Sequence, residues 1–205
     1  MIRTSIQKNI LFSMSELPNL ILANDYVPFK QYPLIGFTGR AGSGKDTAAD
    51  YLVEHFSYYK LTFANPIKLA CKELYGFTHD ELYGDKKNIT NQHGFLPRLA
   101  FTQLGDMCRN QDPEFFIKRL NIDLIPLLNK NVQVVISDVR FPDEIKFIKE
   151  NKGIVIGLQR DTVLPHSLAK HPSEIIHIDQ SDYIIHNNKS INELYKQIDS
   201  IMSML

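Results

Sequence analysis

The chain has 205 residues, which is long enough for one α/β domain with a substantial core. Its 23 Lys and Arg residues balance 23 Asp and Glu residues, so the zero net charge argues against stable binding to nucleic acid or to an anionic membrane. No apolar run approaches the roughly 18 residues of a membrane span, and Cys71 and Cys108 offer neither a disulfide framework nor a metal-ligand spacing. We therefore expect a cytoplasmic protein.

Residues 1–32 precede the first expected strand and have no evident place in the core pattern. We interpret them as an N-terminal extension, which either packs on the domain or serves a partner or a homodimer. In residues 33–205, apolar runs alternate with helical patterns, which predicts one α/β domain with a mostly parallel, five-stranded sheet. The expected strands are 34–38, 59–63, 132–138, 154–159 and 183–186.

The first expected strand, LIGFT, leads directly into GRAGSGKDT (residues 39–47), and an apolar helical pattern follows. This context is typical of a phosphate-binding P-loop, in which backbone N–H groups, a helix N-terminus and a lysine surround an anion. The candidate nucleotide-binding residues are Gly39, Ala41, Gly42, Ser43, Gly44, Lys45, Asp46 and Thr47.

Asp46 occupies the position where the P-loop pattern G-x-x-x-x-G-K-[ST] places a hydroxyl. A carboxylate there is a good ligand for Mg²⁺, directly or through a water, and it indicates metal-dependent nucleotide binding. Thr47 can offer its hydroxyl to the α-phosphate. The alternative is that Asp46 is an ordinary first-turn residue favoured by the helix dipole.

Helix start signals occur at Asn65-Pro66 and Asp112-Pro113, and Ser190 with Glu193 forms a capping box. Between the second and third strands, at about 65–130, several polar side chains fit a substrate-binding insertion. Candidates for this role are Lys68, Arg98, Gln103, Asp106 and Arg109. Each alone could be a solvated surface residue, and Gln103 does not share a helix face with both arginines.

The segment VVISDVRFPDEI places Asp138 at the end of an apolar strand, with Arg140 two residues later. Asp138 is similar to a Walker-B carboxylate that holds magnesium, although a carboxylate here could also cap a loop. Arg140 lies where open α/β sheets bind ligands. The polar segment 160–176 predicts a lid with Arg160 at its hinge. His166, Lys170 and His171 in this lid could add positive charge over the transferring phosphate.

Together GRAGSGKDTAADYL, FANPIKLACKELYGF, RLAFTQLGD, SDVRFPDEI and HPSE resemble the bacteriophage-type deoxynucleoside monophosphate kinases over residues 34–190. These kinases are related to phosphomevalonate kinase, which shares the GKDT sequence. The resemblance implies a P-loop kinase three-layer sandwich with a lid, and ATP and Mg²⁺ as cofactors. It also implies small-molecule nucleotide substrates and, for a phage protein, the host cytoplasm.

The resemblance also implies residue roles. Lys45 would hold the β- and γ-phosphates, and Lys68, Arg98, Arg109 and Arg140 the monophosphate and its base. Gln103, Asp106 and Glu174 would complete the substrate site. The catalytic set would be Lys45, Arg160 and Asp138, with Asp46 and Asp138 on magnesium and Asn187 beside adenine. The lid departs from the familiar pattern because Arg160 is its one arginine.

Two other functions remain open. A P-loop kinase for another small phosphorylated acceptor, such as phosphomevalonate, would share GKDT, although FANPIK and SDVRF resemble the nucleotide kinases more closely. A nucleotide-dependent switch protein is the second. A GTPase of this kind should carry N-K-x-D and D-x-x-G motifs, which this chain lacks.

Overall fold

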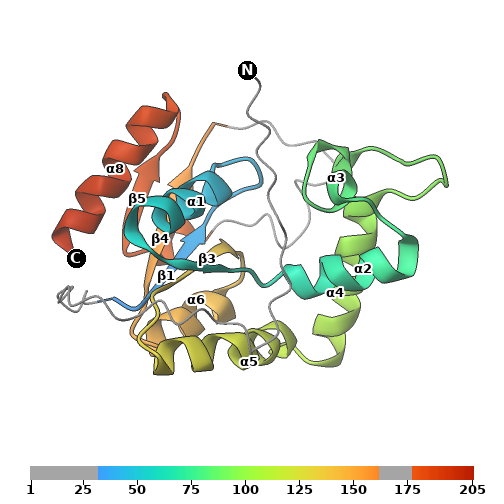
Figure 1. Cartoon of the computed structure of the whole chain (residues 1–205), viewed down its shortest axis with the longest axis horizontal. Coiled ribbons are helices and arrows are strands. Elements are labelled where there is room, and N and C mark those ends of the chain that lie inside the picture. Colours follow the sequence, from blue (N-terminus) through green and yellow to red (C-terminus); the bar gives the residue numbers. More distant parts are fainter. Residues whose placement is uncertain (1–31, 162–176) are drawn as a thin grey trace, which may run out of the picture. The chain divides into compact units, whose positions relative to one another are not determined.

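The computed structural model describes residues 32–161 and 177–205, which belong to one compact unit, and shows a single parallel sheet (Figure 1). Its strand order is β2-β3-β1-β4-β5, and all four neighbouring pairs are parallel. The strands are β1 (Leu34–Thr38), β2 (Tyr59–Leu61), β3 (Val134–Val139), β4 (Ile154–Gln159) and β5 (Tyr183–His186). The predicted bounds of β1, β4 and β5 are confirmed, whereas β2 is two residues shorter and β3 begins two residues later.

The helices follow the expected alternation with the strands. They are α1 (Lys45–Phe56), α2 (Asn65–Tyr75), α3 (His79–Leu82), α4 (Pro97–Gln111), α5 (Phe115–Asn129), α6 (Pro142–Glu150) and α8 (Ile191–Met204), with short 3₁₀ turns η1 (Asp85–Asn88) and η3 (Ile178–Gln180). None of the helices in the described ranges is both long and apolar enough to cross a bilayer.

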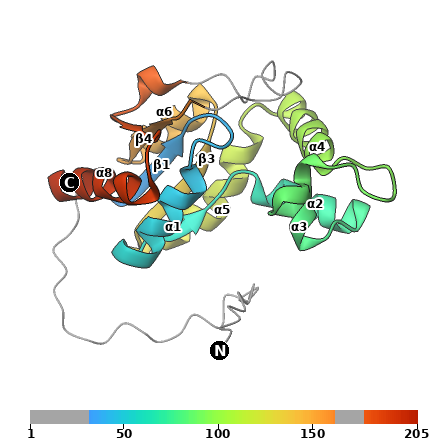
Figure 2. The same cartoon turned by 90° about the horizontal axis from the view of Figure 1, so that it is seen from above.

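Helices cover both faces of the sheet, which gives the expected three layers (Figure 2). On one face, α1 and α8 bury Leu52 and Ile198 against β1, β4 and β5. On the other, α5 and α6 bury Leu124 and Ile148 against β1 and β3. The central strand β1 is fully buried, as its unbroken apolar sequence predicts.

The inserted region between β2 and β3 has a separate small core. Helices α2, α3 and α4 pack around Cys71, Phe77, Leu82 and Ala100. Figures 1 and 2 both place these three helices on the side of the sheet away from α8. The predicted insertion at 65–130 is therefore helical, but α5 belongs to the sheet-covering layer rather than to the separate core.

Two of the three predicted helix starts need correction. The N-cap of α2 is Ala64, and the Asn65 side chain instead accepts a hydrogen bond of 2.8 Å from the Tyr83 hydroxyl. Helix α5 begins at Phe115, because Asp112 ends α4 and its carboxylate accepts from the Glu114 N–H at 3.0 Å. Ser190 caps α8 by accepting from the backbone N–H of Glu193, which is the Ser190 half of the predicted capping box.

Candidate active site

The loop between β1 and α1 has the backbone conformation of a phosphate cradle. Gly39, Gly42 and Gly44 have φ values of +143°, +78° and +102°, which side-chain-bearing residues rarely adopt. A Cβ added to Gly44 would collide with Nδ2 of Asn187, and one added to Gly39 would collide with the Leu158 carbonyl. The loop therefore needs glycine at both positions because its backbone passes so close to its neighbours.

Lys45 is the first residue of α1 and lies across the inside of this loop. Its side chain is buried, and Nζ donates to the carbonyls of Gly39 at 2.6 Å and Arg40 at 2.7 Å. The Ser43 hydroxyl is buried beside it without a hydrogen-bond partner among the described atoms. A lysine, an unsatisfied hydroxyl and a helix N-terminus around one glycine-rich turn fit a bound phosphate.

Residues that follow β4 and β5 brace the same loop. The Asn187 amide donates to the Ser43 carbonyl at 2.8 Å and is 7% exposed. Arg160 Nη1 lies 3.4 Å from the Gly42 carbonyl, so the predicted hinge arginine does reach the loop. Contact of Asn187 with adenine stays a prediction, because its amide N–H is directed at the loop.

The Asp46 side chain contacts residues of the strands β2 and β3. Its Oδ1 accepts from the Ser137 hydroxyl at 2.8 Å and lies 3.0 Å from Lys60 Nζ. The side chain is 79% exposed. Partial removal from water by the surrounding protein acts to raise the pKa of Asp46, but the Lys60 ammonium and the Ser137 hydroxyl act more strongly in the opposite direction, so the pKa is lowered. The carboxylate is therefore charged at neutral pH.

Asp138 lies beside Ser137 but has different partners. Its two oxygens accept from the backbone N–H groups of Phe63 at 2.8 Å and Ala64 at 2.9 Å. Burial raises the pKa of Asp138, although these two hydrogen bonds oppose the shift. In this structure the carboxylate thus fixes the turn between β2 and α2, and a magnesium contact stays a prediction.

The donors around Asp46 suit magnesium only together with a nucleotide. Among the described residues no group of three or more His, Cys, Asp or Glu side chains could hold a metal by itself. Mg²⁺ is commonly bound by one or two carboxylates and by substrate phosphates, with water completing its shell. Asp46, next to the Ser137 hydroxyl, supplies that kind of ligand set.

Lys68, on the first turns of α2, faces this site from the insertion. Its ammonium lies 4.5 Å from the centre of the Tyr83 ring. Burial lowers the pKa of Lys68, although the negative charges of Asp138 and Asp46 act on it in the opposite direction. The predicted cation of the insertion and the predicted metal-binding carboxylates therefore belong to one electrostatic cluster.

The Arg109 guanidinium contacts side chains at the start of α6. It donates to the buried carboxylate of Glu144, lies 3.4 Å from Asp143 Oδ2, and its Cζ is 3.7 Å from the centre of the Phe141 ring. In this structure Arg109 links α4 to the start of α6, and its predicted substrate role stays a prediction. Sequence reasoning missed Glu144, which reads as an ordinary first-turn acid.

Glu144 also fixes the backbone of Arg140, because its Oε2 accepts from the Arg140 N–H at 2.7 Å. Arg98 lies near the start of α4, where its Nε donates to Asn88 Oδ1 at 2.6 Å. Arg98 and Arg109 share a helix face about 16 Å apart along the axis, whereas Gln103 lies about 140° around the helix from Arg98. The structure therefore does not bring Gln103 together with the two arginines, and Asp106 is exposed.

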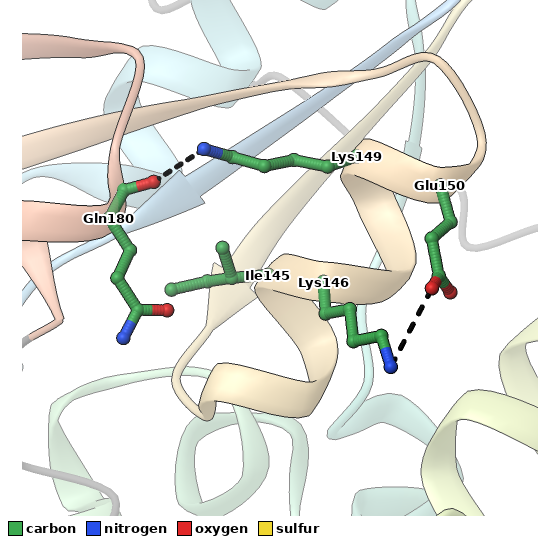
Figure 3. A pocket seen from close by; sticks show the side chains of 5 residues that line it. All are labelled: Ile145, Lys146, Lys149, Glu150 and Gln180. Atoms are coloured by element: carbon green, nitrogen blue, oxygen red, sulfur yellow. Dashed lines mark hydrogen bonds and ion pairs between the residues drawn. The ribbon is translucent and has the colours of Figure 1, made fainter.

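The remaining predicted lid residues lie outside the described ranges: His166, Lys170, His171 and Glu174. A hollow lined by α6 and η3 has no residue in common with the loop site (Figure 3). Its lysines already have partners, since Lys149 donates to the Gln180 carbonyl at 2.7 Å and Lys146 lies 3.7 Å from Glu150. It is therefore a poor phosphate site.

Comparison with known proteins is consistent with a kinase. The sequence model of the phosphomevalonate kinase family matches residues 37–154. A putative deoxynucleotide monophosphate kinase of Acanthamoeba polyphaga mimivirus is 36% identical over 184 residues, which cover 82% of this chain and 94% of that protein.

Two solved structures have weaker likeness. Dephospho-CoA kinase from Campylobacter jejuni is 14% identical, covers 84% of this chain and 96% of its own, and has a TM-score of 0.47. Shikimate kinase from Acinetobacter baumannii, in complex with shikimate, is 16% identical, covers 86% and 96%, and has a TM-score of 0.42. The chain belongs to the phosphomevalonate kinase family of P-loop kinases.

Proposed function

We propose that the protein transfers the γ-phosphoryl group of ATP to a deoxynucleoside 5′-monophosphate, giving the diphosphate and ADP. The observation that carries this proposal is the position of Lys68. A cation of the insertion lies close enough to the P-loop carboxylate for their charges to interact. In the proposed reaction the two phosphorylated ligands would meet between the loop and the insertion. The name of the 36% identical viral relative supports a deoxynucleotide as the acceptor.

The donor side of the reaction follows from the loop. Lys45 would leave the carbonyls of Gly39 and Arg40 and bind the β- and γ-phosphates, which the N–H groups at the start of α1 also hold. Asp46 would hold a magnesium ion, which when bound neutralises phosphate charge. Arg160, already beside the loop, would stabilise the charge of the transferring group.

The acceptor side needs positive charge but no strong base. The attacking atom is a phosphate oxygen that is already ionised at pH 7, so catalysis consists of positioning and electrostatic stabilisation. Lys68, Arg98 and Arg140 would bind the acceptor. Arg109 would act indirectly, through Glu144 and the backbone of Arg140.

The test is ADP release measured with each of the four deoxynucleoside monophosphates and with ribonucleotides as controls. Lys68→Met should raise the KM for the acceptor about tenfold or more, because a partly buried phosphate ligand is lost, with a smaller change in the KM for ATP. Lys72→Met removes an exposed lysine of the same helix and should change neither value. If no monophosphate accelerates ADP release, the proposal is wrong.

Phosphomevalonate is the second candidate acceptor, because the matching family model carries that name over residues 37–154. Including phosphomevalonate in the same acceptor series separates the two kinases by their kcat/KM values. Slow ATP hydrolysis that no acceptor accelerates would instead favour a nucleotide-dependent switch. A cytoplasmic setting and a homodimer stay predictions.

A further inference from the structure

Lys60 is a cation of the site that the P-loop pattern does not include. It lies in the edge strand β2, and its Nζ is 3.0 Å from Asp46 Oδ1 and 2.9 Å from Asp50 Oδ1. Asp46 and Asp50 are four residues apart on α1, so both carboxylates lie on the same side of that helix. The Lys60 side chain is 25% exposed, and its ammonium bridges the two acids.

The position of this bridge is more informative than its strength. An exposed ion pair typically contributes little to stability, but Asp46 directly follows the loop lysine. A carboxylate there repels the phosphates of an incoming nucleotide unless a positive charge lies beside it. Lys60 supplies that charge, and Asp50 gives the ammonium a second partner that lies farther along α1 from the loop.

We propose that Lys60 is a positioning residue that neutralises Asp46 until a metal-bound nucleotide arrives. Lys60 then stays with Asp50 while Asp46 turns to the magnesium ion. This inference rests on the proposed function, because it requires that Asp46 meets magnesium. Lys60 therefore permits binding of metal-free nucleotide and competes with the metal for Asp46. The dependence of nucleotide binding on magnesium is consequently smaller than the loop alone would give.

The test is calorimetric binding of ADP, once with excess EDTA and once with magnesium, to the full chain. Lys60→Met should weaken ADP binding about tenfold in EDTA, since an unscreened Asp46 then faces the phosphates. With magnesium the change should be less than threefold. Lys118→Met is the matched control. It removes a lysine of α5 that is paired with Asp112, and it should change neither affinity.

A double-mutant cycle tests the mechanism. In an Asp46→Asn background, Lys60→Met should leave the affinity for metal-free ADP unchanged, because the carboxylate next to the loop is gone and Asp50, the remaining partner of Lys60, lies farther along α1 from the loop. Equal weakening with and without magnesium would instead mean that Lys60 itself binds phosphate. Unchanged affinities together with a lower melting temperature would mean that the bridge only supports the fold. Either result overturns the inference.

Asp50→Asn provides a variant that keeps Lys60 in place. Removing the second partner should leave the Lys60 ammonium on Asp46. The magnesium concentration that gives half of the maximal increase in ADP affinity should then rise several-fold. An unchanged magnesium requirement contradicts the exchange between the two acids. If ADP binding to the unsubstituted protein does not respond to magnesium at all, the proposed metal role of Asp46 fails, and the inference fails with it.

Discussion

The pH dependence of stability can be tested at Glu144. Its carboxylate is 2% exposed and accepts hydrogen bonds from three donors, the Arg109 guanidinium and the backbone N–H groups of Arg140 and Phe141. Burial raises the pKa of Glu144 to about 7, against the opposing effects of the Arg109 guanidinium and the Arg140 N–H. The ordinary value is 4.5. Between pH 4.5 and about pH 7, the folded protein therefore keeps a proton on Glu144 that the unfolded chain has released.

The sign of the pH dependence follows from this difference. A carboxyl group whose pKa is raised by folding favours the folded state at low pH, and this contribution is lost as the pH rises from about 4.5 to about 7. With 1.36 kcal/mol for each pKa unit, the change between pH 5 and pH 8 is about 2–3 kcal/mol. For a domain of this size that corresponds to roughly 4–12 °C in melting temperature.

Comparison with Glu144→Gln isolates this contribution, because glutamine does not titrate. The amide will lose some hydrogen bonding to Arg109 or to the backbone, but that loss is independent of pH. Urea unfolding of both proteins from pH 5 to pH 8 gives the difference between their free energies of unfolding. The unsubstituted protein should lose about 2–3 kcal/mol relative to the variant over this range.

A difference that moves in the opposite direction would refute the reasoning. It would show that the Arg109 guanidinium outweighs burial and that Glu144 is an ionised partner in a stabilising pair. The link between α4 and α6 would then strengthen with pH rather than weaken.

Two further predictions concern the loop. Lys45→Ala should lower kcat about 10²–10³-fold, as for the loss of one preorganised charge donor. A melting temperature within a few degrees of that of the unsubstituted protein shows that the fold is intact, and near-normal turnover would contradict the role of Lys45. Asn187→Ala should lower the free energy of unfolding by about 1–3 kcal/mol, because the buried Ser43 carbonyl loses its donor, and should raise the KM for ATP. Asn188→Ala, at the exposed neighbouring position, is its control, and equal effects of the two substitutions would show that bracing of the loop is not specific to Asn187.

The fold was accessible from the sequence where one interaction dominated. Strand β1 and the P-loop could be predicted because an unbroken apolar run and glycines with positive φ each allow few structures. The sequence predicts the start of α5 too early, because Asp112-Pro113 has the form of a helix start signal. In the structure the Asp112 carboxylate instead accepts from the Glu114 N–H, in the turn that precedes α5. Local capping patterns of this kind cannot distinguish a helix start from the turn that precedes it.

The site was less predictable because its charges pair across elements. Arg109 and Glu144 are 35 residues apart, and only the contact of α4 with the start of α6 makes Arg109 a partner of the buried Glu144 carboxylate. Lys60 has no motif, and it reaches Asp46 because β2 is the edge strand next to β3 and α1. A lysine within a short strand is otherwise an ordinary edge residue.

The aspartate after the loop lysine has physical consequences beyond the loop itself. A hydroxyl at that position is neutral and needs no counter-charge when nucleotide is absent. A carboxylate adds a negative charge beside the phosphate site, and the chain must offset it from another element. The structure shows this offset in Lys60 of β2 and in the Ser137 hydroxyl of β3. The exchange of a hydroxyl for a carboxylate therefore involves a helix and two strands. The metal affinity of the Asp46 carboxylate consequently depends on Lys60 and Ser137 as well as on the loop sequence.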